Sequence, residues 1–471
     1  METASETKLL GTAPIGRLVM KYAVPSVISL LVNALYNIVD QIFIGQGVGY
    51  LGNAATNVIF PLTVIVIAFS LLVGDGAAAY LSLKLGEGRK DQAQRGVGNA
   101  VTLLVIFGAA FLLLGIFFLE PLAHLFGATE NSLPYALDYG RIIILGFPFV
   151  VIGTGLNLCI RAEGSPKVAM ISMIAGAVVN TILDPVFIFA CGWGVEGAAL
   201  ATILGQVLTF LISALYLRKP KVLQVSRRDM KLSFRTAKTV MGYGVSSFIT
   251  QIAITVSILV SNNMIVQYGA ASVYGPDIPL AAFGIVMKVY QILLAFMIGF
   301  GIGAQPIVGF NYGARNFLRV KKAYLLAVLC ATAVAAVGFV MFQFFPQGII
   351  NLFGSEDALY NEFAQKSFRI FLMLCILAGF QTVTGIFFQS IGKPVKAAVV
   401  TLSRQILVLV PATLILPIFI GLDGVLWAGP VADAISFLIA LVLALLELKH
   451  LTSQHAREQE AALCAEQGQA F

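Results

Sequence analysis

The chain has 471 residues, of which 59% are hydrophobic and only 11% are charged, with a formal net charge of +7. Soluble domains carry charge on roughly 25% of their residues, so this chain has too little polar side-chain surface to cover a soluble particle of its size. Its basic residues lie in short clusters between apolar stretches. This composition excludes a soluble enzyme, a disordered protein and a nucleic-acid-binding protein.

Twelve apolar stretches are long enough to cross a membrane as helices, which takes about 20 residues each. The first is too long for a secretory signal peptide and has no small-residue cleavage site behind it. The stretches also lack the alternation of membrane β-strands, so we predict an all-α integral membrane protein. The predicted spans are residues 18–44, 53–83, 97–119, 139–160, 168–190, 195–217, 240–267, 279–310, 323–345, 368–390, 397–420 and 424–446.

Loop charges predict the direction of these spans. The loops after the even-numbered spans hold most of the basic residues, including eight in the segment 218–238. Lys and Arg accumulate on the cytoplasmic side of membrane proteins. We therefore expect a multi-pass protein of the cytoplasmic membrane with both termini in the cytoplasm.

The second half of the sequence repeats the first. Residues 54–90 match 281–317 at an offset of 227, and further matches occur at offsets of 228 and 230. Two six-helix bundles are therefore predicted, related by a pseudo-two-fold axis along the membrane normal as in some secondary transporters. The predicted domains are a bundle 1–217, a basic cytoplasmic linker 218–239, a bundle 240–446 and a cytoplasmic tail 447–471. The matched pairs include Gly74/Gly301, Gly76/Gly303, Gly164/Gly392 and Pro166/Pro394.

Carboxylates within the first bundle predict a polar site. Asp40 in the first span and Asp184 in the fifth lie about 6–12 Å below the outer surface, at about 1.5 Å per residue. Thr202 in the sixth span reaches the same depth, and Asn180 lies one helical turn from Asp184. Ionisable side chains in spans are costly in lipid and are functional candidates. The alternative is a set of interhelical hydrogen bonds that only hold the bundle together. The residues that share a helix face with Asp40 and would support this pocket are Asn33, Tyr36 and Asn37.

The remaining unusual residues in the spans have less specific interpretations. Lys288 and Asp433 lie at similar depth in the second bundle, where we expect either a neutral buried pair or a role in drug or ion binding. Asp75 and Arg404 are interpreted as interfacial, near the cytoplasmic ends of their spans. Pro25 removes one helical hydrogen bond from the first span and predicts a bend there, either a moving hinge or a static kink.

Three short segments carry a distinctive pattern: residues 33–45 read NALYNIVDQIFIG, residues 161–166 read RAEGSP and residues 180–185 read NTILDP. Together they resemble the MATE (multidrug and toxic compound extrusion) transporters, in particular the branch with DinF-like and MepA-like members. The resemblance implies a transporter that exports bulky and often cationic organic compounds in exchange for protons or sodium. It does not imply an enzyme. It also implies a coupling role for four residues, which are Asp40, Asn180, Asp184 and Thr202.

Other functions fit the sequence less well, and a flippase for a lipid-linked saccharide is the runner-up. A large cleft with many basic residues would favour a flippase, whereas the buried charge here is mostly acidic. A major-facilitator transporter would carry a Gly-x-x-x-Asp-Arg pattern after span 2, which is not present. A membrane enzyme would need a His or paired carboxylates near an interface, but the three histidines lie in loops or in the tail.

Few partners are expected beyond the membrane and the transported compounds. The five cysteines include no CxxC motif and accompany no histidine cluster, so we expect neither a disulfide framework nor a metal site. The expected partners are small organic molecules and the lipid bilayer, with no nucleic acid and no cofactor other than the coupling ion. We expect the protein to function as a monomer.

Overall fold

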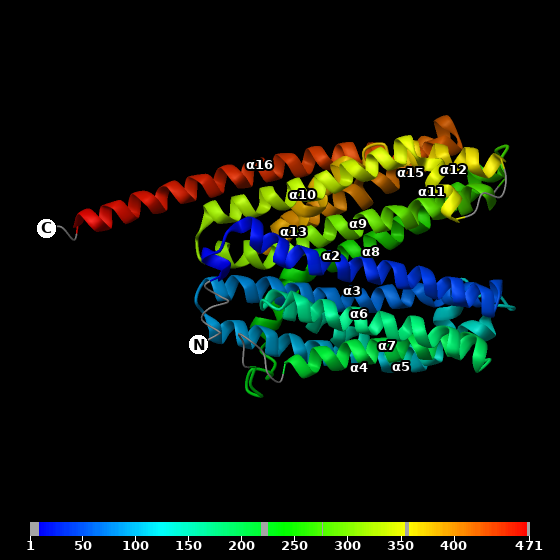
Figure 1. The fold of residues 1–471 in the computed structure, drawn as a ribbon, viewed down its shortest axis with the longest axis horizontal. Helices are drawn as coiled ribbons and strands as arrows, with labels where there is room; N and C mark the ends of the chain where they lie inside the picture. Colours follow the sequence, from blue (N-terminus) through cyan, green and yellow to red (C-terminus); the bar gives the residue numbers. More distant parts are fainter. Residues whose placement is uncertain (1–8, 218–224, 276, 354–357, 469–471) are drawn as a thin grey trace. The chain divides into compact units, whose positions relative to one another are not determined.

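The computed structural model describes residues 9–217, 225–275, 277–353 and 358–468, and within these ranges it contains helices and no strand (Figure 1). The predicted all-α class is confirmed. In chain order the elements are α2 (Ile15–Gly47), α3 (Tyr50–Gly86), α4 (Lys90–Leu125), α5 (Leu133–Ala162), α6 (Pro166–Pro185), the π-helix η1 (Val186–Ala190), α7 (Gly194–Tyr216), α8 (Phe234–Ala270), α9 (Asp277–Gly313), α10 (Phe317–Phe344), α11 (Pro346–Phe353), α12 (Ala358–Phe371), α13 (Cys375–Ser390), α14 (Pro394–Leu402), the π-helix η2 (Ser403–Leu409), α15 (Val410–Ile420) and α16 (Leu422–Gly468).

Eleven helices in the described ranges are long and apolar enough to span a membrane, and a bent pair brings the number to as many as twelve. The pair is α12 and α13, which meet at an angle of 51°. The predicted tenth span, 368–390, starts too late, because the helical segment begins at Ala358. Its first turns were missed because α12 is amphipathic, with Phe363 buried but Glu362 and Arg369 exposed.

The described chain divides into two compact units. Unit 1 consists of the described residues within Pro25–Leu85 and Arg89–Ile252, and unit 2 of those within Lys8–Val24, Gly86–Gly88 and Ala253–Phe471. Two of the boundaries fall well inside continuous helices, within α2 and within α8, and a third separates the last residue of α3 from the rest of that helix. The predicted division at a linker 218–239 differs from this grouping, in which the described part of that segment belongs to unit 1.

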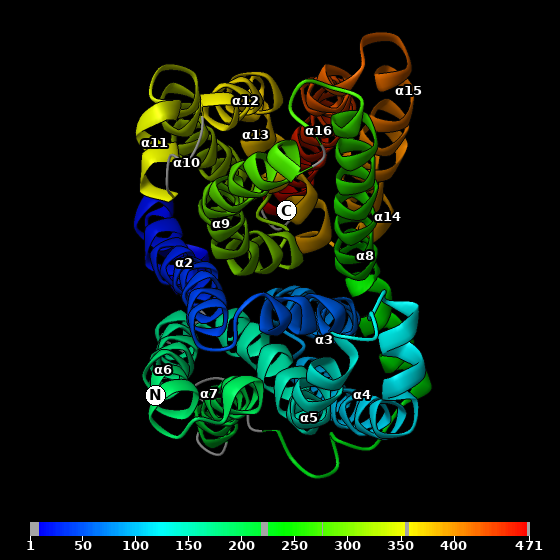
Figure 2. The same ribbon diagram turned by 90° about the vertical axis from the view of Figure 1, so that its right-hand side faces the viewer.

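In unit 1, α5 packs against both α4 and α7, and α7 packs against α6. Figure 2 shows this order, with α7 between α6 and α5. Small residues allow the close approach: Gly108 of α4 lies against Pro148 of α5, and Gly176 of α6 lies against Gly205 of α7. Such contacts favour association in a membrane, where apolar lipid gives the helices no hydrophobic drive to associate.

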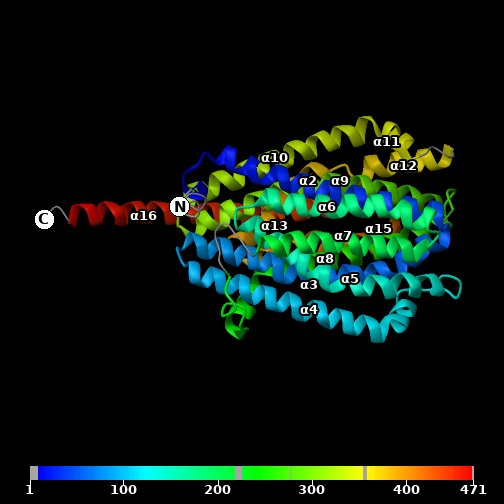
Figure 3. The same ribbon diagram turned by 60° about the horizontal axis from the view of Figure 1, so that its bottom comes forward.

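In unit 2, α9 packs against α10, α12 and α13, and α16 packs against α15 and α13. Aromatic side chains fill this core, with Phe283, Phe388 and Tyr324 fully buried. The hydroxyl of Tyr324 forms a hydrogen bond of 2.8 Å with Thr384, so the one polar atom of this side chain is satisfied. Figures 1 and 3 show that α16 continues past α10 and α13 of the same unit.

The repeat appears in the helix bounds. Helices α3 and α9 both have 37 residues and begin 227 residues apart, as do α4 and α10. One matched pair, Gly76 and Gly303, has the same role in both units. A methyl group on Gly76 of α3 would collide with the backbone of α8 at Val240, and one on Gly303 of α9 with the backbone of α2 at Ala23. Each unit therefore uses its repeat glycine to bring two helices into backbone contact.

Candidate functional site

The predicted polar site lies in unit 1, where α6 ends. Asp184 is the penultimate residue of α6 and is followed by Pro185, after which the chain continues as the π-helix η1. Proline has no N–H to donate to the preceding turn, and π-helical turns are wider than α-helical ones and often occur at functional sites. The sequence Asp184-Pro185 thus places a carboxylate where the regular helix is interrupted.

Three of the four predicted coupling residues are joined by hydrogen bonds. Nδ2 of Asn180 donates to Oδ1 of Asp184 at 3.2 Å and to Oγ1 of Thr202 at 3.3 Å. Asp184 is completely buried and Asn180 is nearly so. Because Thr202 belongs to α7, these bonds tie the end of α6 to its neighbour, and the close approach at Gly176 and Gly205 makes the distance short enough.

The fourth predicted residue, Asp40 of α2, completes the cluster. Its carboxyl group is buried and interacts directly with that of Asp184. Tyr36, one turn earlier in α2, and Tyr139 of α5 lie within electrostatic range of both carboxyl groups. Sequence reasoning missed Tyr139, because a tyrosine at the end of a predicted span is ordinarily an interfacial residue.

Three oxygen atoms of the cluster make no hydrogen bond within the described residues. In the described chain, Oδ1 of Asp40, Oδ1 of Asn180 and Oδ2 of Asp184 are buried without a hydrogen-bond partner. Buried polar atoms are nearly always partnered, and two adjacent carboxylates cannot both hold a full charge in a low dielectric at small cost. A proton, or a hard cation with oxygen ligands, would give these buried oxygens a partner and would reduce the negative charge of the two carboxyl groups. The described residues contain no group of three or more His, Cys, Asp and Glu side chains that could hold a metal ion.

The supporting residues predicted on α2 differ in what they contact. Nδ2 of Asn37 donates to the backbone oxygen of Asn33 at 2.7 Å, so these two amides bond mainly along their own helix. Tyr36 lies beside Asp40 and contacts Asn37. Pro25 lies inside α2, which continues through it, and is the first residue of α2 that belongs to unit 1.

Asp75 is buried in unit 1, in contrast to the predicted interfacial position. It interacts with the side chain of Ser247 and electrostatically with Arg161, which is itself buried. Nη2 of Arg161 donates to Oδ1 of Asn157 at 3.0 Å, and Nδ2 of Asn157 donates to the backbone of α6 at Ala169. This charge group was missed because depth along a helix does not reveal which face it presents.

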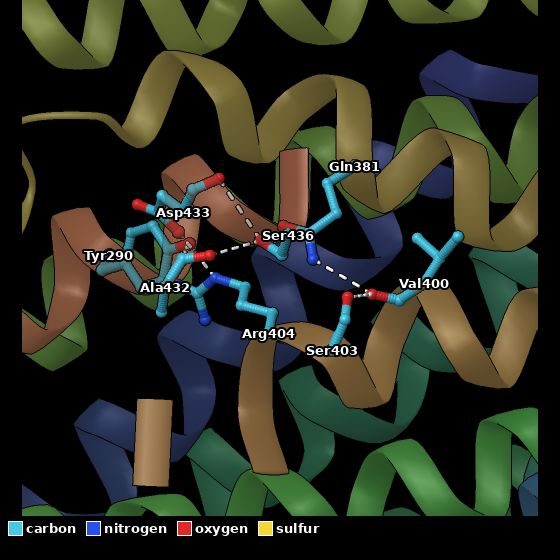
Figure 4. Close-up of polar contacts among 8 residues, drawn as sticks. All are labelled: Tyr290, Gln381, Val400, Ser403, Arg404, Ala432, Asp433 and Ser436. Atoms are coloured by element: carbon cyan, nitrogen blue, oxygen red, sulfur yellow. Dashed lines mark hydrogen bonds and ion pairs between the residues drawn. The ribbon is translucent and has the colours of Figure 1, made fainter. Parts of the chain in front are cut away.

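In unit 2, Asp433 pairs with Arg404 and not with Lys288 (Figure 4). Nε of Arg404 lies 2.7 Å from Oδ1 of Asp433, and Nη2 lies 3.2 Å from the hydroxyl of Tyr290. Lys288 is exposed. The Lys288–Asp433 pair, one of the two alternatives expected for these residues, is therefore not formed, and Arg404 is mostly buried, in contrast to its expected interfacial position. Arg404 lies in the π-helix η2, whose wider turns shift the direction of side chains away from the α-helical register that we assumed.

The MatE family model matches residues 25–186 and 252–414, which together are more than half of the chain. The chain belongs to the MatE family. The two matched segments repeat with the offset found within the sequence, so each contains one copy of the repeat. Members of this family are membrane transporters, and this MatE protein is therefore a multi-pass transporter of small molecules and not an enzyme, as predicted.

Relatives cover nearly the whole chain. The multidrug export protein MepA of Staphylococcus saprophyticus is 26% identical over 444 residues, covering 93% of this chain and 95% of that protein. A protein of Shewanella oneidensis named FAD transporter is also 26% identical, covering 90% and 92%. A solved structure described as the outward-facing conformation of a multidrug resistance MATE family transporter has the same fold, with a TM-score of 0.88, 24% identity and coverage of 95% and 98%.

Proposed function

We propose that this MatE transporter exports bulky organic compounds across the cytoplasmic membrane in exchange for protons or sodium. The observation that carries the proposal is the buried cluster in which the carboxyl groups of Asp40 and Asp184 interact and Asn180 links Asp184 to Thr202. The relatives named as multidrug export proteins support the substrate class, and they do not favour the alternative of a flippase for a lipid-linked saccharide. No cofactor is proposed other than the coupling ion.

The coupling follows from charge neutralisation. Binding of a proton or a sodium ion at the two carboxyl groups removes negative charge from the interior of unit 1. It also competes for the oxygens that now accept bonds from Asn180, so the contact between α6 and α7 changes with ion occupancy. Because Asp40 lies on α2 after Pro25, binding of the ion also acts on the helix segment that begins at this proline.

Organic cations are the proposed main substrates. The chain contains 34 Phe, 14 Tyr and 11 Met, and these side chains bind flat cations through apolar contact and cation–π attraction. A carboxylate pair that is charged in the absence of the coupling ion attracts the same cations. Ion and drug then exclude each other electrostatically, which is the condition for exchange. We further propose that the protein acts as a monomer.

Transport in proteoliposomes tests the coupling residues. Under separate proton and sodium gradients, the wild-type protein should export ethidium with one of the two ions. Asp40→Asn and Asp184→Asn should insert and fold, because an amide has nearly the same shape, yet their gradient-driven export should fall to the level of empty liposomes.

Asp138→Asn is the matched control, since it removes the same charge from a half-exposed position on α5. It should export at the wild-type rate. If Asp40→Asn and Asp184→Asn also export at the wild-type rate under both gradients, the ion is coupled at another site.

A further inference from the structure

Arg404 of unit 2 is held inside a membrane-spanning segment with much of its hydrogen-bonding capacity unused. Its Nε donates to Asp433 at 2.7 Å and its Nη2 to the hydroxyl of Tyr290 at 3.2 Å. The guanidinium carbon also lies 5.6 Å from the centre of the Tyr290 ring, in cation–π contact. Asp433 and Tyr290 come from α16 and α9, so three separate elements define the position of this one side chain (Figure 4).

The bonds that are made use only one edge of the guanidinium group. This planar group has five N–H donors, and Nε and Nη2 together form its side edge. The end edge, formed by Nη1 and Nη2, keeps three N–H groups that have no acceptor within the described chain. Two parallel donors of this kind match the two oxygens of a carboxylate or a phosphate, which is the geometry of the strongest charge-assisted hydrogen bonds.

The free end edge is open to a ligand. The side chain of Arg404 is 12% exposed, whereas that of Asp433 is 2% exposed. No guanidinium nitrogen of Arg404 is among the enclosed atoms that lack a partner. Exposure of an ionised guanidinium to lipid is costly, so this edge faces a polar or ligand-filled space and not the hydrocarbon.

The surrounding bonds fix the backbone that carries Arg404. The carbonyl of Val400, in α14 just before the π-helix η2, accepts from Nε2 of Gln381 at 3.2 Å and from Oγ of Ser403 at 2.7 Å (Figure 4). These two bonds hold the turn that precedes Arg404 against α13, whereas the end edge of Arg404 has no acceptor within the described chain.

We infer that the end edge of Arg404 binds a carboxylate or phosphate group of a transported compound. Unit 2 then accepts the anionic part of zwitterionic or anionic organic substrates, in addition to the cations attracted by unit 1. This inference rests on the proposed export function and names a substrate class for it. The contact with Asp433 runs through Nε, so it leaves the end edge available for a second acceptor.

Two flavins that differ by one phosphate test the inference. Binding of riboflavin and of flavin mononucleotide is measured by calorimetry with the purified full-length protein in phosphatidylcholine nanodiscs. Arg404→Gln should weaken binding of flavin mononucleotide about 10- to 100-fold, as expected for loss of charge-assisted hydrogen bonds. Riboflavin affinity should change less than about 3-fold, because riboflavin has no phosphate group for Arg404 to bind.

Further variants separate binding from folding. Arg404→Lys keeps the charge but loses the fork, so it should recover only part of the affinity for the phosphate. Asp433→Asn should bind flavin mononucleotide at least as well as the wild type, because a competing carboxylate is removed. If Arg404→Gln and Asp433→Asn instead weaken both flavins equally and lower the melting temperature together, Arg404 is a structural partner and the inference is overturned.

The source of the phosphate is a separate arm of the experiment. A short-chain, soluble phosphatidic acid is titrated in the same way. If it binds with Arg404 dependence while flavin mononucleotide does not, the site takes a lipid phosphate and the substrate assignment is wrong. Ethidium export, measured in parallel, keeps the two proposals distinct. Export without Arg404-dependent flavin binding overturns only this inference. Absence of export overturns the proposed function, and Arg404-dependent flavin binding would then define a binding site without a transport role.

Discussion

Asp75 and Arg161 place opposite charges in the interior of unit 1, and the guanidinium group is connected further to Asn157. Asn157 in turn donates to the α6 backbone at Ala169 and to Oγ of Ser172. A single residue, Arg161, therefore balances a charge on α3 and holds the junction between α5 and α6. Removal of one partner from such a group leaves the other charge buried without compensation.

Arg161→Gln should lower the free energy of unfolding by about 1–3 kcal/mol, the scale for loss of a buried hydrogen bond that leaves its partner unsatisfied. The measurement is thermal melting of the purified protein, followed by tryptophan fluorescence. Asp75→Asn combined with Arg161→Gln should be more stable than Arg161→Gln alone, since the uncompensated carboxylate is gone.

Arg141→Gln is the control, because the side chain of Arg141 is 69% exposed and its ion pair with Asp138 is long, at 3.7 Å. It should change stability by less than about 0.5 kcal/mol. Equal melting temperatures for the Arg161 and Arg141 variants would mean that the buried charge is compensated by another group.

Residue spacing was sufficient to group Asn180 with Asp184, because positions four apart always share a helix face. The depth argument also placed Asp40 and Thr202 at the same level, and the structure brings all four together. Arg404 could not be assigned in this way. Its direction depends on the π-helical turns of η2, and the sequence has no periodic pattern that distinguishes such turns from an α-helix.

At the scale of helices, Gly76 and Gly303 are equivalent positions of the repeat at which two backbones meet within a unit. The sequence repeat pairs these two glycines, but it does not identify the helices that lie against them. Those neighbours are segments of α8 and α2, which are far away along the chain. Contact between distant segments depends on the fold as a whole and leaves no local signal in a single sequence.

Gly76→Ala should destabilise the protein by about 1–3 kcal/mol, because the added methyl group meets backbone atoms that cannot rotate away. Gly303→Ala should behave in the same way. Melting temperatures of the variants check this expectation.

Gly242→Ala and Gly284→Ala are matched controls on α8 and α9, since open space surrounds both positions. Because alanine is the better helix former, these variants should be as stable as the wild type or more stable by about 0.5–1 kcal/mol. Controls that lose as much stability as the Gly76 variant would indicate that helix flexibility, and not backbone contact, sets the need for glycine.

For the whole molecule, the predicted number of spans depends on treating α12 and α13 as one bent unit. With that span included, the alternation of loop charges predicts that the α4–α5 and α8–α9 connections lie outside the cell and that Ser226 lies inside. An orientation of this kind rests on charge bias, which is a property of the sequence and is independent of helix packing.

Single cysteines in a cysteine-free background measure this orientation. Asn131→Cys and Val273→Cys should react with an impermeant thiol reagent in intact cells, because both positions are exposed and Val273 is 81% accessible. Ser226→Cys should react only after the membrane is permeabilised. Labelling of Ser226→Cys in intact cells would reverse the assigned direction.

The division of α2 and α8 between the two units has a consequence for biosynthesis. A ribosome makes the segment that ends at Val24 long before the part of unit 2 that begins at Ala253, within α8. Unit 1 in turn is complete only when α8 has been made up to Ile252. Neither unit can reach its final packing as an isolated early product, so the two must mature together late in synthesis. A gene split at the linker would yield two fragments that each lack a piece held by the other, and only their co-expression would restore both units.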